Sequence, residues 1–472
     1  MAETAGDQRL RDVMLFGGIV IFAAVLRGYR IAEWDMWTDQ VQTLWMIVTN
    51  KYILGPMYST APVSFWLTRT GIELFGENEL GIRFVPWLAG VLTVASFLWI
   101  SRHWLGRRVA ILGGLFLTLA IWHVGWSQTG RHFALQTLSV LLALNFFLLT
   151  WLEKKPWGIW GSAVLLLIGT FMDSSTVFLL SAFLAFLGVG WLAASAGEAD
   201  RRPRAWIREA IPYALVLLIY LPIFFGRGRL LMANKPAWNP PWNIIGSLLF
   251  YLPPWILLSA LAGVFVLASR RQFHLAVLLA LLFAVPAVLV TVSSSLTIAS
   301  AAYCLASLPA LAMLVGVAGD WLLESATDRL QRNAATALIV GFFLSQGAIL
   351  AHYYFVYNGL KPRWKEVSAY VDQRRLPGEE FFAIEGDVPQ FYLGRGQAAW
   401  LHEPQLKADP VSGAWYAVPV AAGPTGGAYD WRYRYLQGKA DLIEVFPVHY
   451  GAKDRTLALF RIMATSGEPD AE

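Results

Sequence analysis

Long apolar runs alternate with short polar links along most of the chain. By the criterion of about 20 residues for crossing a bilayer, about eleven runs are long enough or nearly so. They lie at 12–31, 82–101, 109–126, 133–152, 158–172, 175–195, 210–225, 244–268, 273–292, 299–318 and 334–356. The pattern predicts a polytopic α-helical membrane protein with about eleven transmembrane helices.

A shorter amphipathic segment follows the first apolar run, at residues 37–50. One stripe of a 3.6-residue helix is formed by Trp37, Val41, Leu44, Trp45 and Val48. Such a stripe predicts a helix that lies flat in the membrane interface with its apolar face in lipid. The remaining polar positions, Asp39 among them, then face away from the lipid.

From about residue 357 the pattern changes to that of a water-exposed domain. "RWKEVSAYVDQRR" predicts an amphipathic helix, and "FFAIEG", "LIEVFPVHY" and "TLALFRI" predict short strands. We therefore expect a membrane domain at 1–356, in which 32–80 is an outer-face loop with interfacial helices. A small extracytoplasmic α/β domain at 357–472 follows it.

The composition supports the membrane assignment and excludes several classes of site. The chain is 57% hydrophobic and 15% charged, with a mean hydropathy of +0.50. Its single cysteine, Cys304, excludes an intramolecular disulfide and a cysteine-based metal site. There is no nucleic-acid-binding module, and we expect no nucleic-acid partner. The first apolar run lacks a small-residue cleavage site and is interpreted as a retained helix.

Lysine and arginine are concentrated in alternate links, which predicts the orientation. The basic set is Arg9 and Arg11; Arg102, Arg107 and Arg108; Lys154 and Lys155; Arg201, Arg202, Arg204 and Arg208; Arg270 and Arg271; Arg329 and Arg332. Because basic links stay in the cytoplasm, the amino terminus is expected inside. An odd number of helices then places the carboxyl-terminal domain and the loop after the first helix outside.

Two carboxylates stand among tryptophans in this loop, in "AEWDMWTDQVQTLWM" (32–46). Tryptophan rings prefer the headgroup level, so Trp34, Trp37 and Trp45 are expected to fix the depth of the segment. Asp39 lies off the apolar stripe and is either a catalytic residue or part of a solvated helix face. Asp35 is interpreted as an N-cap or first-turn acid of the same helix.

Five segments, taken in order, resemble one family. They are "LRGYRI" with the following "DQ", "TAPVSFWL" (60–67), "LFGENELGIRFVPWLAG" (74–90), "SQTGRHFALQT" (127–137) and "AAYCLASLPALAML" (301–314). In this order they resemble the bacterial protein mannosyltransferase/aminoarabinose transferase-like glycosyltransferases of the GT-C superfamily. The resemblance implies a GT-C fold in a bacterial inner membrane.

The resemblance also implies an activity. Family members move a sugar from a polyprenyl phosphate to a lipid, glycan or protein acceptor on the outer face of the membrane. The family's general base carries onto Asp39, and attack opposite the phosphate would invert the anomeric centre. Arg131 matches a family arginine and is the candidate for binding the donor phosphate, with an arginine snorkelling to water as the alternative. Arg83 matches a second arginine, with structural pairing to a carboxylate as the alternative.

Several positions depart from the family pattern or carry supporting roles. Gln40 replaces a second acid, Thr60 replaces histidine or lysine, and Ala302 stands where arginine is common, next to Tyr303. Asp173 is either a supporting site residue or a turn aspartate. Because one carboxylate is a poor metal site, we expect no divalent metal and no other cofactor.

The neutral positions leave a second interpretation open: a catalytically divergent GT-C scaffold that binds a partner. A transporter of lipid-linked glycans is a third interpretation. The ionisable residues disfavour it, because they cluster on the outer face rather than at mid-membrane.

Overall fold

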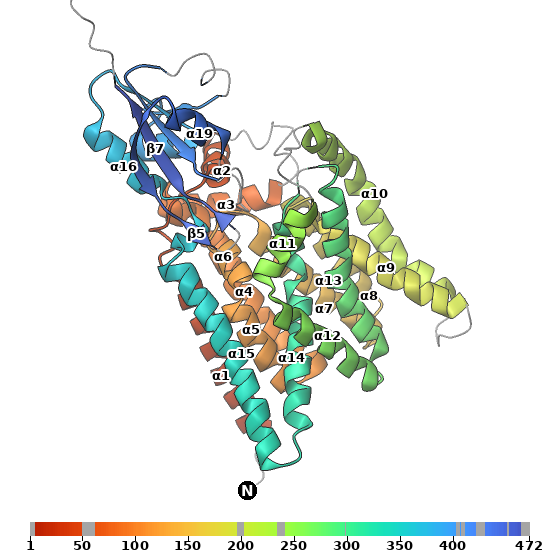
Figure 1. Ribbon diagram of the computed structural model, residues 1–472. Coiled ribbons are helices and arrows are strands. Elements are labelled where there is room, and N and C mark those ends of the chain that lie inside the picture. The colour runs from red at the N-terminus through yellow and green to blue at the C-terminus, as the bar shows by residue number, and fades with distance from the viewer. Residues whose placement is uncertain are drawn as a thin grey trace, which may run out of the picture. The chain divides into compact units, whose positions relative to one another are not determined.

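A computed structural model describes residues 5–49, 62–195, 203–233, 241–297, 299–402, 406, 411–421, 430–450 and 453–463. The chain divides into two compact units (Figure 1). The first contains residues 1–31 and 50–350, and the second contains residues 32–49 and 351–472. We predicted a division into 1–356 and 357–472. The second unit instead includes the segment 32–49, which the prediction had assigned to the membrane domain.

The first unit is helical throughout its described part. Its elements are α1 (Ala5–Gly28), α3 (Pro62–Phe75), α4 (Glu79–Leu105), α5 (Arg107–Leu119), α6 (Ile121–Ser127), α7 (Phe133–Trp151), α8 (Trp157–Met172), α9 (Thr176–Ser195), α10 (Pro203–Ala233), α11 (Pro241–Tyr251), α12 (Pro254–Ser269), α13 (Phe273–Ser293), η2 (Ala301–Ser307), α14 (Leu308–Glu324) and α15 (Arg329–Phe355). The last helix continues beyond residue 350 into the second unit.

Seven of the described helices are long and apolar enough to cross a membrane, or up to nine if each of two bent pairs forms one span. The bent pairs are α5 with α6, at 59°, and α11 with α12, at 81°. Prolines 253 and 254 account for the second bend, because proline removes a helical hydrogen bond. The polytopic helical fold is therefore confirmed, but the count of eleven is not. The run at 158–172 forms a helix of only 16 residues, and α1 is also outside the spanning set.

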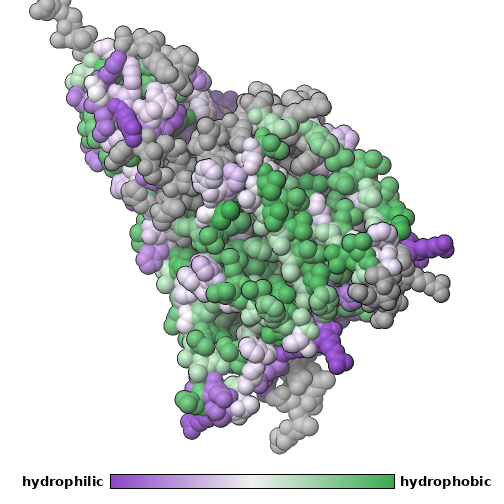
Figure 2. Space-filling model, turned by 45° about the vertical axis from the view of Figure 1, so that its right-hand side comes forward, coloured by the Kyte–Doolittle hydropathy of each residue, from purple (hydrophilic) through white to green (hydrophobic). Residues whose placement is uncertain are grey.

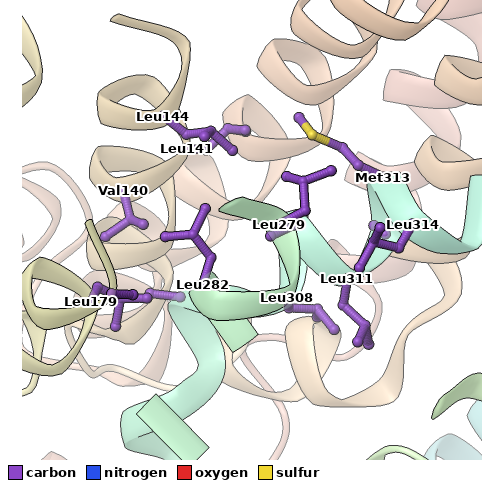
Figure 3. Close-up of a cluster of buried hydrophobic side chains, with 14 of the residues drawn as sticks. Val140, Leu141, Leu144, Leu179, Leu279, Leu282, Leu308, Leu311, Met313 and Leu314 are labelled. Carbon is purple, nitrogen blue, oxygen red and sulfur yellow. The ribbon is translucent and has the colours of Figure 1, made fainter. Parts of the chain in front are cut away.

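One apolar cluster holds the helices of the first unit together. Side chains from α7, α9, α13 and α14 meet in it, as Figure 3 shows for Leu141, Leu179, Leu279 and Leu311. The face of the first unit seen in Figure 2 is also largely apolar, and Phe265 of α12 is 66% exposed. A surface of this kind is stable in lipid rather than in water.

Glycines let neighbouring helices approach α14 closely. A Cβ at Gly263 of α12 would lie 2.1 Å from the Leu314 carbonyl oxygen, and one at Gly113 of α5 would lie 2.5 Å from that of Ala312. Small residues at such crossings are typical of helix packing in membranes, where close backbone contact replaces the hydrophobic driving force.

Ion pairs join the basic links at one end of the first unit. Asp12 of α1 lies 2.5 Å from both Arg102 and Arg107, and His103 lies 2.7 Å from Glu153. Arg270 forms a further ion pair with Glu324. The links predicted to be cytoplasmic are thus connected to one another by charge.

The second unit is a small α/β domain, as predicted. It contains α2 (Thr38–Val48), η3 (Asn358–Leu360), α16 (Trp364–Arg374), β1 (Glu380–Ala383), α17 (Asp387–Leu393), β2 (Ala399–Trp400), β3 (Ala414–Pro419), α19 (Trp431–Gln437), β4 (Asp441–Phe446), β5 (His449–Tyr450), β6 (Lys453–Asp454) and β7 (Leu457–Ile462). The main sheet has the order β2-β1-β3-β7-β4. Strand β1 is parallel to β2 and β3, and β7 is antiparallel to β3 and β4. Both faces of β3 and β7 are buried, consistent with their central positions.

Candidate active site

Asp39 lies in the first turn of α2, the helix predicted at 37–50. The helix begins after Trp37, which is extended, and the Thr43 hydroxyl donates to the Asp39 carbonyl at 2.6 Å. The Asp39 side chain is partly exposed, whereas that of the next residue, Gln40, is fully buried. Residues 39 and 40, which match an acid pair in the family that the sequence resembles, therefore have different surroundings, and the acid at position 39 is partly exposed.

The apolar stripe of α2 does not face lipid. Val41 and Leu44 are buried inside the protein, at 0% and 1% exposure. The prediction of a lipid-facing stripe is therefore wrong, because periodicity reports which face is apolar but not what covers it. This burial fixes the rotation of the helix and hence the direction of Asp39.

The three tryptophans also have partners within the second unit. Trp34 is buried, with its ring 5.3 Å from that of Tyr353 and 5.7 Å from that of Tyr354. The Lys361 amine lies 5.4 Å from the ring centre of Trp37, and Trp45 has a similar contact with Arg395. Aromatic and cation–π packing thus occupies rings that we expected to anchor in the membrane interface.

Asp35 does not cap α2, contrary to prediction, since no side chain caps that helix. Its carboxylate instead accepts from the backbone N–H of Lys365 at 2.6 Å and from the Asn358 amide at 3.2 Å. Lys365 is in the first turn of α16, so Asp35 caps a helix 330 positions away in the sequence. Burial raises the pKa of Asp35, against the opposing effect of these hydrogen bonds.

Two further carboxylates of the second unit lie against the polar face of α2. The Gln42 amide donates to Asp387 at 2.9 Å, and Glu385 accepts from the Trp364 indole N–H at 3.0 Å. Burial raises the pKa of Glu385, an effect that nearby Arg455 opposes and the charge of Asp39 reinforces. Sequence analysis missed both acids, because no local pattern links them to α2.

In the first unit, Arg83 is fully buried near the start of α4. Its Nη1 donates to the Ile31 carbonyl at 2.8 Å, which ties α4 to the segment after α1. Arg131 lies between α6 and α7, and its side chain is partly exposed. Tyr303, in η2, is half-buried and beside Phe133, with ring centres 6.1 Å apart. Thr60 lies outside the described residues.

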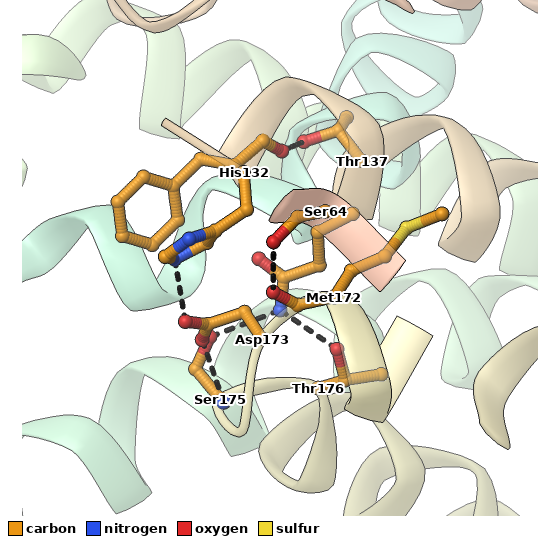
Figure 4. A network of polar contacts seen from close by, with 9 residues as sticks. Ser64, His132, Thr137, Met172, Asp173, Ser175 and Thr176 are labelled. Atoms are coloured by element: carbon orange, nitrogen blue, oxygen red, sulfur yellow. Dashed lines mark hydrogen bonds and ion pairs between the residues drawn. The ribbon is translucent and has the colours of Figure 1, made fainter. Parts of the chain in front are cut away.

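A buried polar network surrounds Asp173 (Figure 4). The His132 Nε2 lies 2.5 Å from Asp173 Oδ2, and both side chains are almost fully buried. Asp173 also accepts from the Ser175 backbone N–H at 2.7 Å, as a turn aspartate does, while its supporting role in the site stays a prediction. Gln136 donates to Ser175 and Thr176, both at 2.9 Å. The network joins the start of α7 to the turn between α8 and α9.

His132 was absent from the predicted site residues, although it directly follows Arg131. The one available signal was a second ionisable side chain in the same short link. Among the described residues, no group of three His, Cys, Asp or Glu side chains is arranged to hold a metal ion.

One segment of the first unit matches a known protein family. Residues 59–226 match the family described as dolichyl-phosphate-mannose-protein mannosyltransferase. A protein of Aquifex aeolicus (strain VF5), described as an uncharacterized protein, is 26% identical over 126 residues. That alignment spans 26% of this chain and 25% of the relative's length.

Solved structures match over much more of the chain. The structure of ArnT from Cupriavidus metallidurans in the apo state covers 94% of this chain and 97% of its own, with a TM-score of 0.55 and 15% identity. The same protein bound to undecaprenyl phosphate matches with a TM-score of 0.55 and 14% identity, over 95% of this chain and 97% of its own. The oligosaccharyltransferase of Archaeoglobus fulgidus has a TM-score of 0.55 and 13% identity, over 83% of this chain and 62% of its own. The chain therefore has the fold of the GT-C membrane glycosyltransferases, the superfamily that its sequence resembles.

Proposed function

We propose that this chain is a glycosyltransferase that moves a sugar from a polyprenyl-phosphate donor to a lipid, glycan or protein acceptor. The observation that carries the proposal is the fold match over nearly the whole chain to ArnT, which was also solved with undecaprenyl phosphate bound. The mannosyltransferase-family match of residues 59–226 supports the same reaction class.

In this proposal Asp39 is the general base. It takes the proton of the acceptor hydroxyl, whose oxygen forms a bond to the anomeric carbon. The electrons of the bond between that carbon and the phosphate oxygen leave with the polyprenyl phosphate. Attack from the side opposite the phosphate inverts the anomeric centre. The partly exposed position of Asp39 in the first turn of α2 suits this role, because a base must reach its substrate.

Arg131 is the proposed phosphate-binding residue. A phosphate at the edge of a low-dielectric membrane requires a cation, and arginine offers two parallel N–H donors. Arg131 is partly exposed, whereas Arg83 is fully buried and donates to a backbone carbonyl. Arg83 is thus the weaker phosphate-binding candidate and has a clear role in anchoring α4.

The proposed orientation has the amino terminus in the cytoplasm of a bacterial cell and the second unit outside its inner membrane. The distribution of basic links supports it, as does their connection through ion pairs at one end of the first unit. Reporter fusions after residues 153 and 360 are expected to label opposite sides of the membrane. Labelling on the same side would contradict the orientation.

We further propose that transfer requires no divalent metal, since Gln40 replaces one acid of the pair. The rate in excess EDTA is expected to equal the untreated rate. A loss that magnesium or manganese restores would overturn this part of the proposal.

The test of function is the release of undecaprenyl phosphate from a panel of undecaprenyl-phosphate sugars, supplied to membranes that contain the protein. Asp39→Asn keeps the shape but cannot take a proton, so release is expected to fall by about 10²–10⁴-fold. The melting temperature should remain unchanged. Full activity in Asp39→Asn would remove the base assignment. Release with none of the sugars would favour a non-catalytic scaffold.

A further inference from the structure

Helix α2 belongs structurally to the carboxyl-terminal domain, although it lies near the start of the chain. Besides the Gln42–Asp387 hydrogen bond, the backbone N–H of Met36 donates to the Tyr392 hydroxyl at 2.7 Å. The Lys365 amine donates to the Glu33 carbonyl at 2.6 Å. These contacts lie on both sides of Asp39 in the sequence and hold the helix against α16, α17 and the turn before α17.

Glu385 occupies that turn, directly after the parallel strand β1. Its backbone carbonyl accepts from the Val388 N–H at 2.9 Å, which fixes the turn, and its side chain accepts from the Trp364 indole at 3.0 Å. The Thr38 hydroxyl also donates to this carboxylate, and the charges of Arg455 and Asp39 act on it. A rigid turn thus holds a buried carboxylate beside the first turn of α2.

We propose that Glu385 is the positioning partner of Asp39, so that the second carboxylate lost at position 40 is supplied by the carboxyl-terminal domain. The inference rests on the proposed function, in which Asp39 is the base. Glu385 touches neither substrate and takes no proton from the acceptor. It orients the first turn of α2 and sets the charge beside Asp39.

The chemical reason is the effect of a nearby negative charge on a buried carboxyl. Burial raises the pKa of the Glu385 carboxyl and the negative charge of Asp39 adds to that shift, so Glu385 holds its proton to a higher pH than an isolated acid would. Loss of the acceptor proton to Asp39 is then balanced by departure of the phosphate, and the proton on Asp39 later passes to water. Ionisation of Glu385 at higher pH places a second negative charge beside the base.

The experiment compares kcat and KM across pH for the full chain, with release of undecaprenyl phosphate as the readout. Glu385→Gln mimics the protonated side chain and keeps an acceptor for Trp364. We expect its kcat to stay within about threefold of wild type at mildly acidic pH, and the upper ionisation of the wild-type profile to disappear. Glu385→Ala loses the hydrogen bonds from Trp364 and Thr38, so kcat should fall roughly 10- to 100-fold with KM unchanged.

Glu379 offers a matched control at the opposite end of β1. Its carboxylate also accepts a tryptophan N–H, from Trp415 at 2.8 Å, and it pairs with Arg461 at 2.5 Å. Glu379→Gln is expected to lower the melting temperature without changing the pH profile. If Glu385→Gln behaves like this control, Glu385 is merely structural and the inference is overturned.

A second experiment introduces Glu385→Ala into the Asp39→Asn variant, and its outcome separates this inference from the proposed function. If Glu385 acts through Asp39, Glu385→Ala should cause no further loss in that background. A further loss equal to that in wild type would overturn the inference alone. Full activity of Asp39→Asn itself would instead overturn the proposed base.

Discussion

Asp173 in the first unit and Asp35 in the second are both buried acids, yet they find their partners in opposite ways. Asp173 pairs with His132 and with the backbone of its own turn, so its contacts come from helices that follow one another in the chain. Asp35 accepts its hydrogen bonds from residues 323 and 330 positions later. The same requirement, that a buried carboxylate must be satisfied, is met locally in one unit and by distant residues in the other.

The difference suggests what each contact stabilises. The Asp173 network holds neighbouring helix ends together within the bundle, whereas Asp35 joins the segment before α2 to the carboxyl-terminal domain. Loss of Asp173 should therefore destabilise the first unit, and loss of Asp35 should act on the second.

The largest effect is expected for Asp173→Ala. It leaves the buried His132 imidazole without its carboxylate and the Ser175 N–H without its acceptor, and should cost about 3–5 kcal/mol of unfolding free energy. Thermal unfolding in detergent measures the change. The double variant His132→Gln with Asp173→Asn, which carries no charge at either position, should recover part of the loss. A single variant as stable as wild type would show that the pair contributes nothing.

Asp35→Ala should have an intermediate effect, about 1–2 kcal/mol, because α16 loses its cap. Asp35→Asn keeps an acceptor and should cost less. Because burial raises the folded-state pKa of Asp35 above its unfolded value, the folded chain holds that proton more tightly. The resulting stability is present at low pH and is lost as the pH rises through the raised pKa. Melting temperatures measured from pH 4 upwards should fall for wild type relative to Asp35→Asn. A constant difference would contradict the pKa shift.

The smallest effect is expected where the charges are exposed. Arg69 and Glu73 form an i,i+4 pair at 2.7 Å on α3, with both side chains largely in solvent. Glu73→Gln should change the unfolding free energy by no more than about 0.3–0.5 kcal/mol. If Glu73→Gln lowered the unfolding free energy as much as Asp35→Ala, burial of the carboxylate would not determine the size of its contribution to stability.

Sequence patterns were sufficient for features that depend on neighbouring residues. They predicted the helical membrane fold, the helix containing Asp39 and the α/β domain after residue 357. They failed where the partner is remote. The stripe of Val41 and Leu44 was assigned to lipid because its periodicity cannot distinguish lipid from a protein core.

Remote partners also explain why Asp35 was assigned to the wrong helix and why Glu385 was missed. Asp35 was placed at the nearest helix start, although the helix that it caps begins more than 300 residues later. Glu385 carries no motif, and only the turn after β1 brings it to α2. Recognising either would have required knowing which strand and helix of the tail lie beside residues 32–49.

The separation between Asp35 and its partner also has a consequence for synthesis. Asp35 is synthesised 330 residues before Lys365, whose backbone N–H donates a hydrogen bond to the Asp35 carboxylate. At a ribosomal rate of about 5–20 residues per second, the interval is roughly 15–65 s. Throughout it, the segment that carries Asp39 lacks the hydrogen bonds that fix it. The proposed catalytic helix therefore gains its final support only when translation is nearly complete.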